Sequence, residues 1–120
     1  MKHQISWDAD NSCARLVLVG EFLPEEVAPI LDGILTMLEG QGSRHLLVDH
    51  TQSPKPVSRK TRTLLEKDAV RVALDKLAFF GVSPLNRMVA RVVVGVIGQS
   101  NTTNFFKTEA DALAWFRAEG

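Results

Sequence analysis

The sequence predicts an α/β fold in which four helices pack against a mostly parallel five-stranded sheet. Short apolar runs alternate with segments whose apolar residues recur every three or four positions, in the order β-β-α-β-α-β-α-β-α. Strands that alternate with helices pair in parallel through right-handed crossovers. The chain has 120 residues, 45% hydrophobic and 23% charged. This length and composition predict a single globular domain, 1–120, with one sizeable core.

The first two strands are expected to form an antiparallel hairpin. His3, Ile5 and Trp7 alternate with polar residues, which indicates a half-buried strand. The polar residues 10–12 predict a turn. The run 14–19 (ARLVLV) ends at a glycine and is typical of a strand that is covered on both faces.

The next two elements are a helix and a short buried strand. A helical apolar stripe runs through Val27, Ile30, Leu31, Ile34, Leu35 and Leu38. Because Pro29 has no amide proton, the helix either begins near Ala28 or kinks there. Gly40 and Gly42 end it, and 45–49 (HLLVD) reads as a buried strand. The two prolines of 51–56 predict a loop.

A second helix is expected over 58–74, with Ser58 as its N-cap, and a strand over 76–82. Ser83 and Pro84 suit the first positions of a third helix, which Gly98 closes. Its apolar residues match the helical period, namely Leu85, Met88, Val89, Val92, Val93, Val96 and Ile97.

The C-terminal segment predicts a short edge strand, 104–106, and a fourth helix. Thr108 and Asp111 have the spacing of a capping box at the start of that helix. Ala112, Leu113 and Phe116 are expected to pack inward.

Three segments make the chain similar to the STAS fold (sulphate transporter and anti-sigma-factor antagonist). The resemblance is strongest to its small sporulation stage II AA-like branch, which is related to CRAL-TRIO domains. The segments are 46–54 (LLVDHTQSP), 76–93 (KLAFFGVSPLNRMVARVV) and 104–116 (NFFKTEADALAWF). The resemblance implies a non-catalytic regulatory or protein-interaction module. Such a module would present the loop after the third strand and the start of the second helix to a partner.

The resemblance also suggests a phosphorylation site at the second helix. Regulatory STAS proteins carry a phosphorylatable serine in an Asp-Ser-Ser-Gly-like motif there, and Ser58 is its nearest counterpart. The acidic residue before it and the glycine after it are missing. Arg59 and Arg62 could pair with a phosphate on Ser58. Together with Ser53 and Lys55, they are the candidate partner-binding residues.

The carboxyl ends of parallel strands gather at one edge of a sheet, where ligands usually bind. The candidate ligand or anion site there consists of Asp49, His50, Thr51, Ser83, Asn86 and Arg87. The third helix would point free amides and the positive end of its dipole at a phosphate or carboxylate. A small anionic or amphiphilic ligand is therefore the alternative to a protein partner, with its apolar part under the third helix.

Other functions are less well supported by the residue pattern. Adjacent strand residues point to opposite faces, so Asp49 is badly placed to orient His50, and no Gly-x-Ser-x-Gly elbow is present. An unidentified hydrolase stays as the second alternative, without assigned catalytic residues. The histidine spacing predicts no metal site, and no cofactor is expected. Zero net charge and the lack of aromatic residues between the cations argue against nucleic acid.

Two further expectations concern location and assembly. The only cysteine, Cys13, cannot form an internal disulfide, which favours the cytoplasm. The longest apolar run, 88–98, contains Arg91 and is too short to insert into a membrane. The second helix becomes apolar on several faces toward its end, which leaves a homodimer through the second and third helices open as an alternative.

Overall fold

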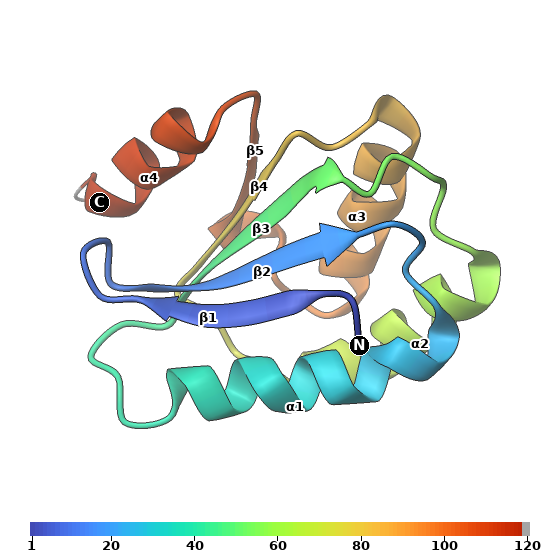
Figure 1. Ribbon diagram of the computed structural model, residues 1–120, viewed down its shortest axis with the longest axis horizontal. Helices are drawn as coiled ribbons and strands as arrows, with labels where there is room; N and C mark the ends of the chain where they lie inside the picture. Colours follow the sequence, from blue (N-terminus) through green and yellow to red (C-terminus); the bar gives the residue numbers. More distant parts are fainter. Residues whose placement is uncertain (119–120) are drawn as a thin grey trace.

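A five-stranded sheet runs through the centre of the molecule, shown in Figure 1. The computed structural model describes residues 1–118. In order across the sheet the strands are β1 (Gln4–Asp8), β2 (Cys13–Val19), β3 (His45–Gln52), β4 (Lys76–Phe80) and β5 (Thr103–Phe106). β1 is antiparallel to β2, and every other neighbouring pair is parallel. The predicted fold class and order of elements are confirmed.

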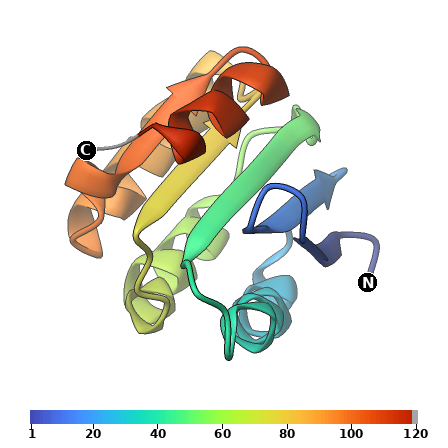
Figure 2. The same cartoon turned by 90° about the vertical axis from the view of Figure 1, so that its left-hand side faces the viewer.

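The helices lie in two layers, one on each side of the sheet (Figures 1 and 2). They are α1 (Val27–Leu38), α2 (Arg59–Asp68), α3 (Pro84–Val96) and α4 (Glu109–Arg117). The parallel strands follow one another across the sheet in chain order, so right-handed crossovers place α1, α2 and α3 on the same face. The α4 helix covers the opposite face.

The two layers enclose cores of different size. The larger core lies between the sheet and α1–α3, with Leu16, Leu18, Val48, Ile30 and Ile34 among its members. The smaller core lies under α4 and consists of Cys13, Leu47, Ala78, Phe80, Ala112 and Phe116. The α4 helix packs on β3, β4 and β5. The expectation that β2 is covered on both faces is therefore wrong for Val17 and Val19, which are half-buried.

The α1 helix begins one residue before Ala28 and is preceded by a 3₁₀ turn, Pro24–Glu26. Pro29 is its third residue. The first amides of a helix have no carbonyl partner within it, so a proline there removes no helical hydrogen bond. Of the two expectations for Pro29, the structure therefore supports a helix start near Ala28.

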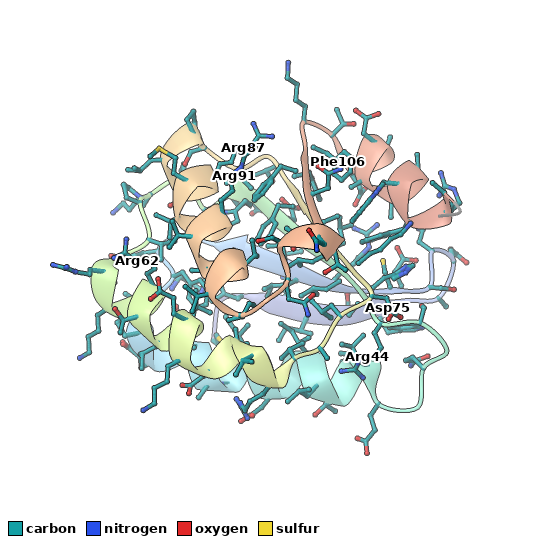
Figure 3. The ribbon with its side chains drawn as sticks, turned by 180° about the vertical axis from the view of Figure 1, so that it is seen from behind. Arg44, Arg62, Asp75, Arg87, Arg91 and Phe106 are labelled. Carbon is teal, nitrogen blue, oxygen red and sulfur yellow. The ribbon has the colours of Figure 1, made fainter. Side chains whose placement is uncertain are left out.

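The α2 helix is shorter than predicted. It ends at Asp68 and passes through a 3₁₀ turn, Ala69–Arg71, into extended chain. The reason is a long-range contact with the start of β3, shown by the labelled Arg44 and Asp75 in Figure 3. The amide of Asp75 donates to the Arg44 carbonyl at 2.9 Å, and the Arg44 amide donates to the Asp75 carboxylate at 3.1 Å. These bonds direct residues 72–75 into β4.

The β3 strand is longer than predicted. It runs to Gln52 and so includes Thr51 and Gln52, the first two residues of the segment predicted as a loop. The Gly20 amide donates to the Gln52 carbonyl at 2.8 Å and continues the pairing with β2. The proline-rich loop therefore begins at Ser53, and its first residue is held against the end of β2.

The α3 helix presents a different face to the core than its apolar pattern suggests. Its buried residues are Asn86, Val93 and Val94. Four of the seven apolar residues that match the helical period are exposed instead, namely Leu85, Met88, Val92 and Val96. Valine, leucine and methionine occur almost all round this helix, so the period alone could not identify the inner face.

Candidate functional site

The carboxyl ends of β3, β4 and β5 and the start of α3 enclose a surface hollow of about 600 Å³. We call it the rim hollow. Figure 3 shows Arg87 and Phe106 on this side of the molecule. The lining residues are His50, Thr51, Pro54, Gly81, Val82, Ser83, Arg87, Phe105, Phe106 and Lys107. Parallel strands thus bring residues far apart in sequence to one edge, as the sequence predicts.

The rim hollow contains four of the six predicted ligand-site residues, namely His50, Thr51, Ser83 and Arg87. Asp49 and Asn86 lie nearby with other roles. Phe105, Phe106 and Lys107, which β5 and the residue after it contribute, were not predicted for this site. An available signal was the position of β5 as the last parallel strand, since its carboxyl end must reach the same edge.

Arg87 and Lys107 give the rim hollow cationic side chains, and Arg87 lies over an aromatic floor. The Arg87 guanidinium is 5.2 Å from the centre of the Phe105 ring, and that of Arg91 is 5.5 Å away on the same ring. Phe105 in turn stacks on Phe79 with ring centres 5.0 Å apart. Cation–π contacts of this kind order the guanidinium groups, which helps to place them for an anion.

Ser83 acts as the N-cap of α3, and its hydroxyl oxygen accepts the Asn86 amide at 3.3 Å. The Asn86 side chain is 2% exposed and holds the loop that leads into α2. Its Oδ1 accepts the Val57 amide at 2.9 Å, and its Nδ2 donates to the Lys55 carbonyl at 2.9 Å. We call this pair of bonds the Asn86 clamp. Asn86 therefore positions a loop and has almost no surface left for a ligand.

Asp49 shapes the end of β3. Its Oδ1 accepts the Thr51 amide at 2.9 Å and the Thr51 hydroxyl at 2.6 Å. This is an Asx-type bond, in which a side-chain oxygen accepts the amide two residues further on. Gly81, which has φ +69°, packs directly against Thr51. Thr51 is thus held from both sides.

His50 is buried between the rim hollow and the main core. Its Nδ1–H donates to the Ser53 carbonyl at 3.3 Å. Burial lowers the pKa of His50, against the opposing effects of the Ser53 bond and of Asp49. The Ser53 side chain is 2% exposed and its hydroxyl donates to the Gly20 carbonyl. His50 therefore contacts the Ser53 backbone and not its hydroxyl, which gives no support to a nucleophilic serine.

The loop after β3 and the first turn of α2 carry the predicted partner-binding residues. Pro54, Lys55, Pro56, Arg59 and Lys60 are exposed, and we call this surface, 54–60, the basic loop. Ser53, in contrast, is buried as an anchor. The clamp and the Ser53 bond hold the loop backbone on both sides of Lys55.

Ser58 is half-buried and caps α2 as predicted, because its oxygen accepts the Thr61 amide at 3.1 Å. Thr61 is fully buried and its hydroxyl donates to the Phe22 carbonyl at 3.0 Å, so the first turn is fixed to the core. Arg62 Nε is buried and has no hydrogen-bond partner within residues 1–118. The Glu66 carboxylate is 3.6 Å from it, close enough for an ion pair.

A second hollow, of about 130 Å³, lies inside the main core between the sheet and α2 and α3. Its lining is almost entirely apolar and includes Leu65, Phe79, Ala90 and Val93. His50 lines both hollows and stands between them. A group of about the size of benzene fits a cavity of this volume.

The three histidines lie in different surroundings. His3 contacts Glu26, the His45 ring stacks on Phe116 at 4.9 Å, and His50 lies at the rim. Within residues 1–118, no three His, Cys, Asp or Glu side chains gather where they could hold a metal ion. In the same part of the chain, no helix is long and apolar enough to span a membrane. Cys13 is buried, and this burial raises the pKa of its thiol to about 11.

Several solved structures resemble this one. A serine-to-glutamate variant of RsbS from Moorella thermoacetica aligns with a TM-score of 0.63 and 14% identity, over 98% of this chain and 96% of the other. An uncharacterised Shewanella loihica protein of the DUF3478 family, with a SpoIIAA-like fold, aligns with a TM-score of 0.66 and 20% identity, over 95% of this chain and 91% of the other. The anti-sigma factor antagonist SpoIIAA in its unphosphorylated form aligns with a TM-score of 0.63 and 16% identity, over 98% of each chain.

No family model matches the sequence, and the comparison with curated proteins gives no match. The structural likeness extends over nearly the whole of each chain. The chain therefore has a STAS/SpoIIAA-like fold, as the three segments of the sequence predicted.

Proposed function

We propose that this protein is a non-catalytic regulatory module that binds a protein partner through the basic loop. The fold is shared with SpoIIAA, which is described as an anti-sigma factor antagonist. Function depends on the site that a fold carries, and the site here is the basic loop.

The observation that carries the proposal is the Asn86 clamp. It fixes the backbone at Lys55 and Val57 while the side chains of Lys55 and Arg59 remain exposed. A loop that is already ordered loses little conformational entropy when it binds. Exposed cations on a fixed backbone suit an acidic surface of a partner.

Ser58 is the proposed point of control. A phosphate at this N-cap would meet the free amides of the first turn of α2 and the cations of Arg59 and Arg62. Arg62 lies one turn after Ser58, and within residues 1–118 its Nε makes no hydrogen bond and only a 3.6 Å ion pair with Glu66, which a phosphate could replace. Among the similar structures, SpoIIAA is in its unphosphorylated form and RsbS carries a serine-to-glutamate change. A phosphate would cancel much of the positive charge of the basic loop and weaken binding of an acidic partner.

Two matched double variants test the proposal in the native host. Lys55→Glu/Arg59→Glu reverses the charge of the basic loop, whereas Lys67→Glu/Arg71→Glu makes the same change near the end of α2 and in the 3₁₀ turn that follows it. Quantitative mass spectrometry of co-purified proteins should show a partner that is at least about tenfold depleted with the first variant and retained with the second. Equal recovery with both variants would contradict the proposal.

Ser58→Asp tests the point of control, since aspartate keeps the N-cap and adds a negative charge. It should deplete the same partner while thermal unfolding stays close to that of the unchanged protein. A partner that binds Ser58→Asp as well as it binds the unchanged protein would exclude this form of control.

A second candidate function is binding of a small amphiphile, which the position of His50 between two hollows favours. An anionic head would lie in the rim hollow near Arg87 and Lys107, and a short apolar tail would enter the inner hollow. A volume of about 130 Å³ is too small for a long acyl chain. Native mass spectrometry would support this function by a bound mass that Arg87→Gln removes, and a spectrum of unliganded protein would count against it.

A further inference from the structure

The α3 helix carries a row of exposed apolar side chains on its outer face. Leu85 is 51% exposed, Met88 66%, Val92 50% and Val96 59%. We call these four residues the α3 row. Among residues 1–118 only two other large apolar side chains are exposed, Met1 and Val70. The apolar surface is thus concentrated on one helix and is not scattered.

The inner face of the same helix is apolar as well, since Val93 and Val94 are buried in the fold. A helix that is apolar on both sides is normally covered on both sides. The inner side is covered by the sheet and α2. Within residues 1–118 nothing covers the outer side in this way, and this imbalance indicates a binding surface.

The spacing of the α3 row identifies a helix as its complement. The intervals of three, four and four residues confine the row to about 80° of the helix circumference. This is narrower than the stripe by which a helix usually joins a core, and it is typical of the seam between two paired helices. Gly95 is exposed beside the row and leaves room for close approach.

The charge around the α3 row identifies the sign of the charge on that partner. Residues 50–108, which include α2 and α3, contain ten Lys and Arg against three Asp and Glu, a net charge of +7. Residues 1–49 have three against eight, a net charge of −5. The α3 helix has two cations, Arg87 and Arg91, and no acidic residue. Figure 3 shows Arg62, Arg87 and Arg91 on the side of the molecule that α2 and α3 form.

We propose that the α3 row binds an amphipathic helix of another protein, with apolar residues at heptad spacing and acidic residues beside them. A second copy of this chain fits poorly, because two such basic faces repel each other. In residues 1–49, the acidic part of the chain, Met1 is the only exposed large apolar side chain. The α3 row shares no residue with the basic loop, so binding at one surface does not require binding at the other.

The test uses two synthetic helical peptides, each with leucine at heptad positions a and d. One carries glutamate at positions e and g, which prevents it from pairing with itself, and the other carries lysine there. Fluorescence anisotropy should show binding of the glutamate peptide that weakens with added salt, and no binding of the lysine peptide. Equal binding of both peptides, or binding of neither, would overturn the proposal.

Two variants assign the binding to the α3 row. Met88→Gln/Val92→Gln should weaken binding of the glutamate peptide at least tenfold, because it removes exposed apolar surface without disturbing the core. Val70→Gln, an exposed apolar residue outside the row, should leave binding unchanged. An equal loss with both would overturn the assignment.

Two further measurements decide between this partner and the others. Sedimentation with phosphatidylcholine and phosphatidylglycerol vesicles should show no binding, and analytical ultracentrifugation should show a monomer. Vesicle binding that Met88→Gln/Val92→Gln abolishes would assign the row to a membrane surface instead. Dimerisation that the same variant abolishes would assign it to a second copy.

Discussion

Gly81 shows how a single residue determines the shape of the rim hollow. It has φ +69°, a conformation that residues with a side chain rarely adopt. A methyl group at this position would also overlap the Thr51 methyl and lie 3.3 Å from the Thr51 backbone. The end of β4 can therefore approach β3 this closely only without a side chain.

Gly81→Ala should lower the free energy of unfolding by about 2–4 kcal/mol, as strain and overlap add. Gly40→Ala is the matched control, because Gly40 has φ +77° and an added methyl group would meet no atom of residues 1–118 within 4 Å beyond its chain neighbours. Gly40→Ala should lower the free energy of unfolding only by the cost of the left-handed backbone conformation, about 1–2 kcal/mol. Adding Thr51→Ser to Gly81→Ala removes the overlapping methyl and should recover the difference in urea unfolding. No recovery would show that the overlap is not the cause.

Glu26 ties the N-terminus to the start of α1. Its carboxylate accepts the Leu23 amide at 2.8 Å, His3 Nε2–H at 2.8 Å and Lys2 Nζ at 3.1 Å. The proton of His3 is on Nε2, because its Nδ1 accepts the Val19 amide. Burial raises the pKa of Glu26, but these hydrogen bonds outweigh it and bring the pKa to about 2.

The lowered pKa of Glu26 predicts a pH dependence of stability. Folding favours the carboxylate, so its contribution is complete above the ordinary pKa of 4.5 and is lost as the pH falls towards 2. Glu26→Gln should lower the free energy of unfolding at pH 7 by about 2 kcal/mol, the value of hydrogen bonds to a charged group. Urea unfolding should show this difference shrinking below pH 4. The exposed neighbour variant Glu25→Gln should show little difference, and a constant Glu26→Gln deficit at every pH would contradict the assignment.

At the scale of elements, the Asn86 clamp joins the start of α3 to the loop before α2. Asn86→Ala leaves the Val57 amide and the Lys55 carbonyl without their partner, which should cost about 2–3 kcal/mol. Hydrogen exchange should show the Val57 amide losing protection, while amides of β3 keep theirs. Asn101→Ala, an exposed position, serves as control. An unchanged Val57 amide would mean that the basic loop is ordered by other contacts.

The α3 helix shows at the same scale why a helix and its orientation are different problems. The N-cap Ser83, Pro84 and the apolar period predicted the helix, and it forms. Its rotation about its own axis depends on Asn86, a polar residue that points inward to reach the basic loop. This inward position turns Val92 and Val96 outward and creates the α3 row.

At the scale of the whole molecule, basic and acidic residues are concentrated in different segments of the chain. The net charge of zero hides a basic segment, residues 50–108 with α2 and α3, and an acidic segment, residues 1–49, whose acidic residues lie mostly in the turns and loops around β1, β2 and α1. Zero net charge argues against a protein that coats nucleic acid, but it says little about how charge is distributed. Both proposed binding surfaces, the basic loop and the α3 row, belong to the basic segment.

The sequence alone determined the elements and their topology. Caps, glycines and apolar periods act between residues a few positions apart. The alternation of strands and helices then requires right-handed crossovers between parallel strands, which sets the topology of the sheet. The edge at which Thr51, Ser83 and Arg87 meet follows from that winding, so it was predicted together with the fold class.

Only the tertiary structure decided what those residues contact. Asn86 bonds to backbone groups 29 and 31 residues away, and Ser53 bonds to Gly20. Arg44 bonds to Asp75 and so directs the chain after α2 into β4. These contacts join segments distant in the chain, and no local pattern encodes them. For the same reason the outward turn of the α3 row became visible only in the folded molecule, where burial depends on every neighbour at once.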